Sequence, residues 1–268
     1  MARPTTSKVP AWIETGSTLR SLDGLLLAGT AVVPQDAPAH AMLLMHGEGT
    51  DREQFGFYAR LAEELGRAGC ASLRFDLPGH GESQGRQEDI TLSGLLNLID
   101  AGLRELRTLA AGASLSLVAT GLTGGIAAGY AARRGDELDR LALIDPLIDY
   151  QRHFIDEDPR WSHGTLSHTA ARELADTGTV AYPPSFRLGR AMLNEVFWLQ
   201  PRGVLEAIRT PTLILHGSGP ATVPFESSRT AAMALTCRHR LVEIEAPQRR
   251  QWRAPTIRAI IEWLLNGE

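Results

Sequence analysis

A glycine-rich stretch, Gly121-Leu-Thr-Gly-Gly125, carries the clearest chemical signal in this sequence. It follows an apolar run, Leu115 to Thr120, that is typical of a buried strand, and small residues suited to a helix come after it. The stretch resembles the pattern Gly-x-Ser-x-Gly, in which a serine on a sharp strand-to-helix turn attacks an acyl group. Thr123 stands at the central place here. The sequence therefore predicts a nucleophile turn in which threonine replaces serine. Whether its hydroxyl reacts depends on a base within hydrogen-bond reach and on a group that orients that base.

The elements that position this turn follow from apolar periodicity. Thr18 to Val33 predicts a β-hairpin with Asp23-Gly24 as its turn, and Thr91 predicts the N-cap of an amphipathic helix. Further strands are expected at 41–45, 70–75, 115–120, 138–144, 213–215 and 241–244, and further helices at 55–65, 121–135, 227–235 and 257–265. Short apolar strands that alternate with helices predict an α/β fold, with a mostly parallel sheet covered on both faces.

The alternation stops between Asp145 and about Arg209. This stretch is rich in aromatic residues and carries the pair Pro183-Pro184. We expect it to form a helical cap over the carboxyl edge of the sheet, which is the edge where open α/β sheets bind ligands.

Composition narrows the range of partners. The 268-residue chain has a net charge of −4, so no nucleic acid is implied as a partner. No apolar run approaches the length of a membrane span, and Met1 to Val9 lacks the apolar region of a signal peptide. Two isolated cysteines, Cys70 and Cys237, fit a reducing compartment. We expect a cytoplasmic protein with a small-molecule substrate or ligand, and its oligomeric state stays open.

Five motifs in a fixed order carry a family resemblance. They are Met45-His46-Gly47, Arg74-Phe75-Asp76, Pro78 to Ser83, the glycine-rich turn, and Thr212 to Pro224. With them the chain resembles the α/β-hydrolase superfamily, and its hairpin start and modest cap are similar to cinnamoyl/feruloyl-esterase-like and thioesterase-like members. The resemblance implies a core formed by residues 1–145 and 210–268, with a small helical cap insertion at 146–209.

The same resemblance implies where the partners of the attacking residue should stand. In the family, the acid lies in a pattern like His-Gly-x-x-Asp-x-x-Val-Pro, and Pro220 occupies that place here. The histidine follows the last strand, where this chain has Arg249. Proline offers no side-chain acceptor, and arginine keeps its proton at any working pH. The sequence therefore predicts a degenerate triad without serine-type hydrolysis.

Two carboxylates are the remaining candidates for chemistry. Glu48 lies in the loop that should donate one N–H to an oxyanion, with a second N–H from Gly124, so it is the first candidate for general acid or base. A Glu48–Arg249 ion pair and two solvent-facing side chains are equally compatible with the sequence. Asp145 is the second candidate, although it also suits a simple turn before Pro146. The substrate-binding candidates are Gly47, Gly124, Arg249 and His153.

Three functions remain open at this point. The first is a repurposed enzyme that acts on a hydrophobic small molecule by acid/base or shape-based catalysis, in a cyclisation, elimination or isomerisation. The second is a non-catalytic relic that binds a ligand or partner, and the third is a weak esterase or thioesterase that uses Thr123. No metal-ligand spacing and no phosphate-binding glycine loop is visible, so no cofactor is expected.

Overall fold

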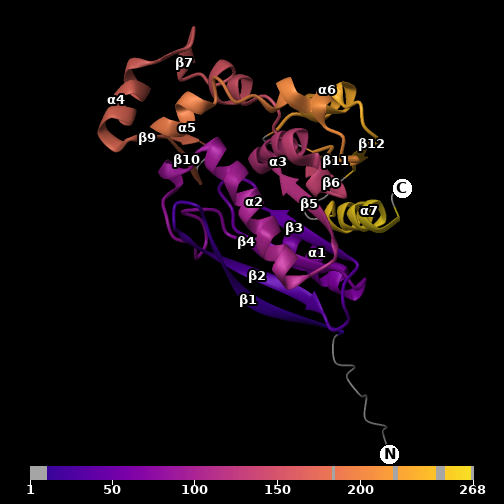
Figure 1. Cartoon of the computed structure of the whole chain (residues 1–268). Coiled ribbons are helices and arrows are strands. Elements are labelled where there is room, and N and C mark those ends of the chain that lie inside the picture. Colours follow the sequence, from indigo (N-terminus) through magenta and orange to yellow (C-terminus); the bar gives the residue numbers. More distant parts are fainter. Residues whose placement is uncertain (1–10, 183–184, 220–222, 246–250, 267–268) are drawn as a thin grey trace, which may run out of the picture.

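An eight-stranded sheet with helices on both faces forms the centre of the computed structural model, which describes residues 11–182, 185–219, 223–245 and 251–266 (Figure 1). The strand order is β1-β2-β4-β3-β5-β6-β11-β12. The pairs β1–β2 and β2–β4 are antiparallel, and the pairs from β4 to β12 are parallel. The predicted mostly parallel α/β sheet is therefore confirmed. The strands are β1 (Trp12–Arg20), β2 (Leu26–Pro34), β3 (His40–Met45), β4 (Ala71–Phe75), β5 (Ser114–Thr120), β6 (Arg140–Ile144), β11 (Thr212–Gly217) and β12 (His239–Ile244).

Five longer helices cover this sheet: α1 (Phe57–Arg67), α2 (Leu92–Leu109), α3 (Gly121–Arg134), α6 (Phe225–Ala234) and α7 (Arg253–Asn266). The predicted N-cap of α2 is confirmed, because the Thr91 hydroxyl accepts a hydrogen bond from the Gly94 N–H at 2.9 Å. Among the helices in the described ranges, none is long and apolar enough to cross a membrane.

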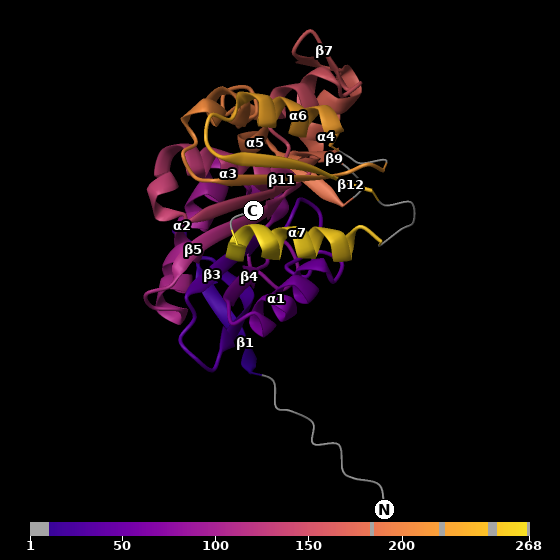
Figure 2. The same ribbon diagram turned by 90° about the vertical axis from the view of Figure 1, so that its right-hand side faces the viewer.

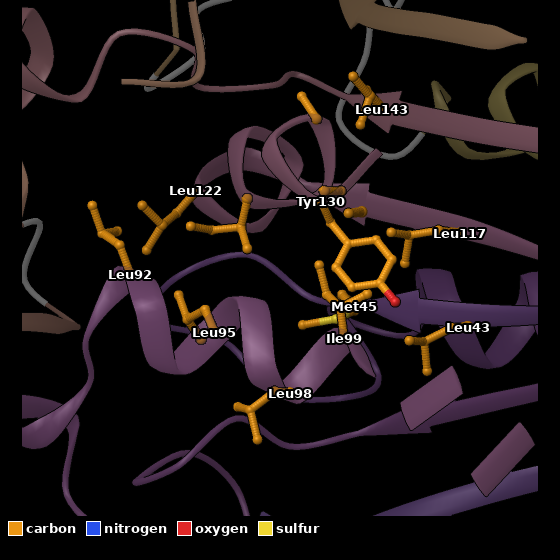
Figure 3. Packing of buried hydrophobic residues seen from close by; sticks show 14 of the residues in the cluster. Leu43, Met45, Leu92, Leu95, Leu98, Ile99, Leu117, Leu122, Tyr130 and Leu143 are labelled. Atoms are coloured by element: carbon orange, nitrogen blue, oxygen red, sulfur yellow. The ribbon is translucent and has the colours of Figure 1, made fainter. Parts of the chain in front are cut away.

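Alternating side chains of the central strands supply a hydrophobic core on each face. In β3, Leu43 and Met45 pack into the cluster formed with α2 and α3, as the close-up in Figure 3 shows. Met42 and Leu44 point the other way, into the cluster formed with α1 and α7. Figure 2 shows α1 and α7 along the same face. Burial on both faces explains why the central strands appear in the sequence as continuous apolar runs.

The segment between β6 and β11 contains strands as well as helices. Its elements are β7 (Trp161–Ser162), β8 (Thr165–Leu166), α4 (His168–Thr177), β9 (Thr179–Tyr182), β10 (Phe186–Gly189) and α5 (Arg190–Glu195), with a π-helical turn at Arg152–Asp156 and a 3-10 helix at Pro201–Ala207. The prediction of a helical cap is therefore wrong in part. Strands of two to four residues are too short to show an alternating pattern in the sequence.

This insertion is fastened to the start of α2, next to which it lies in Figure 1. The Glu195 carboxylate of α5 accepts hydrogen bonds from the Leu92 N–H and, at 2.6 Å, from the Ser93 hydroxyl. A carboxylate at a helix N-terminus satisfies free N–H groups and opposes the positive end of the helix dipole. The insertion is thus held in a defined place over the core.

The winding of the sheet reverses between β3 and β5. After β3 the chain adds β4 on one side, and it then returns to add β5 on the other side. Loops that leave the carboxyl ends of two such strands diverge, and ligands bind in the space between them. In this chain those loops are residues 46–50 after β3 and the turn at Gly121 after β5.

We predict opposite effects on stability for two glycines of α3. A Cβ on Gly125 would lie 2.1 Å from the Leu147 carbonyl oxygen, whereas a Cβ on Gly129 would have its nearest neighbour at 3.5 Å. Gly125→Ala should lower the free energy of unfolding by about 1–3 kcal/mol because backbone must move. Gly129→Ala should raise it by about 0.5–1 kcal/mol, since alanine is the better helix former. Urea denaturation measures both, and effects of the same sign would contradict this packing.

Candidate active site

The turn from β5 into α3 has its left-handed residue at Gly121, with φ of +59°. Thr120 before it is extended, and the helix starts at Gly121 itself. Thr123 lies two residues further on, inside the helix, and has a negative φ. Only glycine adopts the left-handed conformation without strain. The prediction that Thr123 occupies the centre of the turn is therefore wrong, and the residue at that place has no side chain.

Thr123 instead connects the start of α3 to the end of β3. Its side chain is fully buried. Its hydroxyl lies 2.9 Å from the carbonyl oxygens of His46 and Thr120 and 3.2 Å from that of Met45. A hydroxyl has one proton to donate, and here every nearby acceptor is a backbone carbonyl. The geometry gives Thr123 a positioning role, because it holds the loop after β3 against the turn.

The Glu48 carboxylate fills the space beside Gly121. Its Oε2 accepts a hydrogen bond from the Leu122 N–H at 3.0 Å, and a Cβ on Gly121 would lie only 2.8 Å from the same oxygen. The backbone N–H of Glu48 itself is the second donor to this carboxylate. Glu48 and a side chain at position 121 are therefore mutually exclusive in this arrangement.

These two donors have a recognisable place in the turn. In the pattern Gly-x-Ser-x-Gly, the oxyanion hole uses the N–H of the residue after the nucleophile and an N–H from the loop after the first parallel strand. Leu122 follows Gly121, and Glu48 lies in that loop. The carboxylate thus occupies the position in which an oxyanion would be bound. Burial raises the pKa of Glu48, and the two N–H donors partly oppose that rise because they stabilise the charged form.

The loop that carries Glu48 is held by hydrogen bonds on both sides. The Gly47 N–H donates to Gln54 Oε1 at 3.0 Å, and the Gly49 N–H donates to His80 Nε2 at 3.2 Å. His46 is buried, and its Nε2 accepts from the Leu77 N–H at 2.9 Å. Burial lowers the pKa of His46 to about 4, and it also lowers the pKa of His80. Both rings are therefore neutral acceptors at pH 7 and fix the backbone around Glu48.

Tyr150 supports the turn from the insertion side. Its ring is buried, and its hydroxyl donates to the Leu122 carbonyl at 2.9 Å. Burial and, secondarily, the negative charge of Glu48 raise its pKa well above the ordinary value. The ring reaches this place because Gly125 lacks a side chain, since a Cβ there would lie 2.5 Å from the Tyr150 hydroxyl. The backbone of Leu122 thus donates from its N–H to Glu48 and accepts at its carbonyl from Tyr150.

Asp145 joins the ends of two neighbouring strands. Its φ is +44°, and its Oδ1 accepts from the Gly217 N–H at 2.9 Å and lies 3.5 Å from His216 Nδ1. His216 Nε2 must donate to the Val223 carbonyl at 3.1 Å, so in the neutral ring Nδ1 accepts from the Ser228 hydroxyl at 2.7 Å. Burial raises the pKa of Asp145. These contacts give Asp145 a structural role between β6 and β11.

Comparison with known proteins identifies the family of this chain. Residues 36–177, more than half of the chain, match the Hydrolase_4 family, described as serine aminopeptidase, S33. The chain belongs to this family. It is accordingly a member of the α/β-hydrolase superfamily, and the fold expected from the five sequence motifs is confirmed.

Solved structures agree with this fold. The chain is similar to the esterase Est1E from Butyrivibrio proteoclasticus with ferulic acid bound, at 18% identity and a TM-score of 0.75, over 93% of this chain and 99% of that one. It is also similar to a hypothetical protein from Pseudomonas aeruginosa, at 14% identity and a TM-score of 0.73, over 99% and 100%. A monoacylglycerol lipase from Paleococcus ferrophilus has 22% identity and a TM-score of 0.67, over 90% and 99%. At these identities the likeness concerns the fold alone.

The structure brings together some predicted site residues of this family member and separates others. Glu48 and Gly47 lie at the turn, and His153 hydrogen-bonds through Nε2 to the Tyr182 hydroxyl. Gly124 was predicted as the second oxyanion donor, and this is wrong because the donor after the turn is Leu122. Gly124 packs against Pro146 instead, where a Cβ would lie 3.1 Å from the proline Cα.

Some sequence predictions concern residues that lie outside the described ranges. Pro220 and Arg249 are both among them, so the predicted absence of the acid and the histidine, and the Glu48–Arg249 pair, stay predictions. Among the residues that the structure places, no group of three or more His, Cys, Asp or Glu side chains is arranged to hold a metal ion.

Sequence reasoning missed Gly121, Tyr150 and Tyr182. A signal for Gly121 was present, because the turn requires a left-handed residue and glycine adopts that conformation most easily. No comparable signal existed for the two tyrosines. Their hydrogen-bond partners, Leu122 in α3 and His153 in the π-helical turn, lie 28 and 29 positions away in the sequence.

A double-mutant cycle tests whether Glu48 and a side chain at position 121 exclude each other. Gly121→Ser should lower the free energy of unfolding by about 1–3 kcal/mol, because it adds strain at a positive φ and crowds the carboxylate. In a Glu48→Ala background the loss should be smaller by about 0.5 kcal/mol or more, since the crowding is gone. Urea denaturation of the four proteins gives the coupling, and strictly additive effects would show that the two groups do not meet.

The stability of the protein should depend on the ionisation of Glu48. Because burial raises its pKa in the folded state, the folded protein binds this proton more tightly than the unfolded chain. Stability conferred by the group is complete below the ordinary carboxyl pKa and is lost as the pH rises through the folded value. Glu48→Gln keeps an oxygen for the Leu122 N–H without a charge, so its free energy of unfolding should fall less between pH 4 and about 8. Parallel pH profiles for the two proteins would contradict this.

Proposed function

We propose that this α/β-hydrolase family member is an enzyme without serine-type hydrolysis, in which the Glu48 carboxyl transfers a proton to or from a hydrophobic small molecule. The observation that carries the proposal is the hydrogen bond from the Leu122 N–H to Glu48 Oε2, beside a turn residue that lacks a side chain. Base-catalysed eliminations, isomerisations and cyclisations begin with such a proton transfer.

The carboxylate reverses the polarity of the family site. Two N–H groups that would stabilise the developing charge on an ester carbonyl oxygen are already bonded to Glu48. The group at this place is therefore an acceptor that carries negative charge when it is ionised. Such a site disfavours an ester oxygen and favours a group that presents a proton to a carboxylate, such as a hydroxyl or an acidic C–H.

The environment of Glu48 suits it to acid/base work. A carboxyl group is the more effective base or acid at neutral pH when its pKa lies closer to 7, and burial shifts Glu48 in that direction. The pair of N–H donors and the neutral rings of His46 and His80 fix its position. A pre-positioned proton acceptor avoids the cost of reorganisation during the reaction.

Hydrolysis through a nucleophile on the turn has little support. Gly121 offers no nucleophile, and the Thr123 hydroxyl is buried against three carbonyls. In the sequence, Pro220 and Arg249 stand where the family has its acid and histidine. Est1E binds ferulic acid, so this fold accommodates a small aromatic molecule, and we place the substrate in that size range.

The proposal is tested with 5-nitro-1,2-benzisoxazole, which a general base opens in one step. The base takes the proton on C3, the N–O bond breaks, and a nitrile and a coloured phenolate form. The wild-type protein should accelerate this opening, and Glu48→Gln should slow it by about 100-fold or more, since an amide cannot accept the proton. Absorbance of the phenolate gives kcat and KM.

Two controls accompany this measurement. Glu63→Gln on α1, whose carboxylate pairs with Arg67 on the surface, should keep the wild-type rate. Hydrolysis of 4-nitrophenyl butyrate should be at background level and unaffected by Thr123→Ala, which removes the hydroxyl. If Glu48→Gln opens the benzisoxazole as fast as the wild type, or if ester turnover depends on Thr123, the proposal is wrong. A wild-type protein inert towards the benzisoxazole would instead support a non-catalytic binding role.

A further inference from the structure

The hairpin of β9 and β10 lies against the loop that carries Glu48. A Cβ on Gly49 would lie 2.4 Å from the Ser185 hydroxyl, so only glycine at position 49 allows this approach. Phe186 at the start of β10 faces His80 with ring centroids 6.0 Å apart. His80 in turn accepts the hydrogen bond from the Gly49 N–H. The hairpin therefore approaches the loop that carries Glu48 at Gly49 and at His80.

Tyr182 is the last residue of β9, and its hydroxyl hydrogen-bonds to His153 Nε2. A series of ring contacts connects this pair with the turn. Tyr182 meets Phe154 edge-on with centroids 4.6 Å apart, Phe154 lies 6.2 Å from Tyr150, and Tyr150 donates to the Leu122 carbonyl. Burial raises the pKa of Tyr182, and the charge of Glu48 raises it further. The hairpin strand that ends at Tyr182 thus lies beside the loop that carries Glu48, and the charge of Glu48 acts on the Tyr182 hydroxyl.

His153 continues from Tyr182 towards a separate small space. It lines a cavity of about 120 Å³ together with Leu147, Asp149, Arg152, Glu157 and Arg202. Burial lowers the pKa of His153, and the carboxylates of Glu157 and Asp158 partly oppose this. A neutral imidazole has one nitrogen that donates and one that accepts, so it can pass a proton between its two sides.

We propose that Tyr182 is the second acid/base residue of the Glu48 site, with His153 as the positioning residue that resupplies its proton. This inference rests on the proposed function. When Glu48 takes a proton from the substrate, Tyr182 gives its hydroxyl proton to the oxygen or carbon on which negative charge develops. The Nε2 proton of His153 replaces it, and Nδ1 takes up a proton from solvent through the cavity. One proton leaves the substrate and one arrives, so the step needs no other reactant.

This arrangement defines the substrate more closely. A carboxyl on one side and a phenol on the other suit a molecule with an acidic hydrogen at one end and a carbonyl or leaving oxygen at the other. The ring of Phe154 lies between those of Tyr182 and Tyr150, and the rings of Phe154 and Tyr150 are both buried. The chemistry therefore points to a small, flat, uncharged molecule such as an enolisable carbonyl compound or a phenol ether.

The test compares two probes that differ in how strongly the leaving oxygen needs an acid. Unsubstituted 1,2-benzisoxazole releases a much more basic phenolate than its 5-nitro derivative, so protonation of the leaving oxygen matters more. Tyr182→Phe should lower kcat for the unsubstituted probe by about 100-fold and for the nitro probe by less than about 10-fold. His153→Gln, which can still hydrogen-bond to Tyr182 but cannot pass a proton along, should show the same difference between probes.

Matched variants separate this inference from the proposed function. Tyr150→Phe removes a hydroxyl that is bonded to a backbone carbonyl, so it should change both rates by the same factor. Glu48→Gln should abolish the opening of both probes alike. If Tyr182→Phe slows the two probes equally, or slows neither, the acid role of Tyr182 is wrong while the role of Glu48 stands. If Glu48→Gln is without effect, the proposed function itself fails.

Discussion

The hydrogen bond between the Leu122 N–H and the Glu48 carboxylate is the interaction on which the arrangement of this site depends. It requires an empty position at Gly121, because a Cβ there would lie 2.8 Å from the carboxylate oxygen. It also requires the loop after β3 to stay close to the start of α3, and the buried hydroxyl of Thr123 in α3 lies 2.9 Å from the His46 carbonyl of that loop. A change at any of these points would release the carboxylate from the backbone.

A half-buried carboxylate is costly unless its oxygens find donors, and this explains the support around Glu48. Two backbone N–H groups stabilise its charged form, while burial raises its pKa, so the group is held between two opposing effects. The neighbouring histidines cannot neutralise it, because burial lowers their pKa and leaves them uncharged at pH 7. Their nitrogens accept backbone hydrogen bonds instead. The site thus places the Glu48 carboxyl beside two histidines that are uncharged at pH 7.

The fold determines where the site lies, and the side chains at the site determine its chemistry. Reversal of winding between β3 and β5 brings two loops together at the carboxyl edge of the sheet, as in other α/β-hydrolases. In the hydrolase pattern this position presents N–H donors to an oxyanion, whereas here a side chain of the same protein uses them. The insertion then adds Tyr150 and the Tyr182–His153 pair, which have no counterpart in the motif itself. Family membership and a change of chemistry are therefore compatible in one chain.

The sequence by itself determined the order of strands and helices, the mostly parallel sheet and the Thr91 cap, because these depend on local periodicity and on contacts within a few residues. It also identified Glu48 as a candidate general acid or base. The centre of the turn was decided only by the tertiary structure, since Gly121 and Thr123 both fit a glycine-rich pattern and the backbone φ alone distinguishes them. The short strands of the insertion and the hydrogen-bond partners of Tyr150 and Tyr182 could likewise not be predicted from the sequence. The contacts of the two tyrosines join residues 28 and 29 positions apart, and such pairings exist only once the chain has folded.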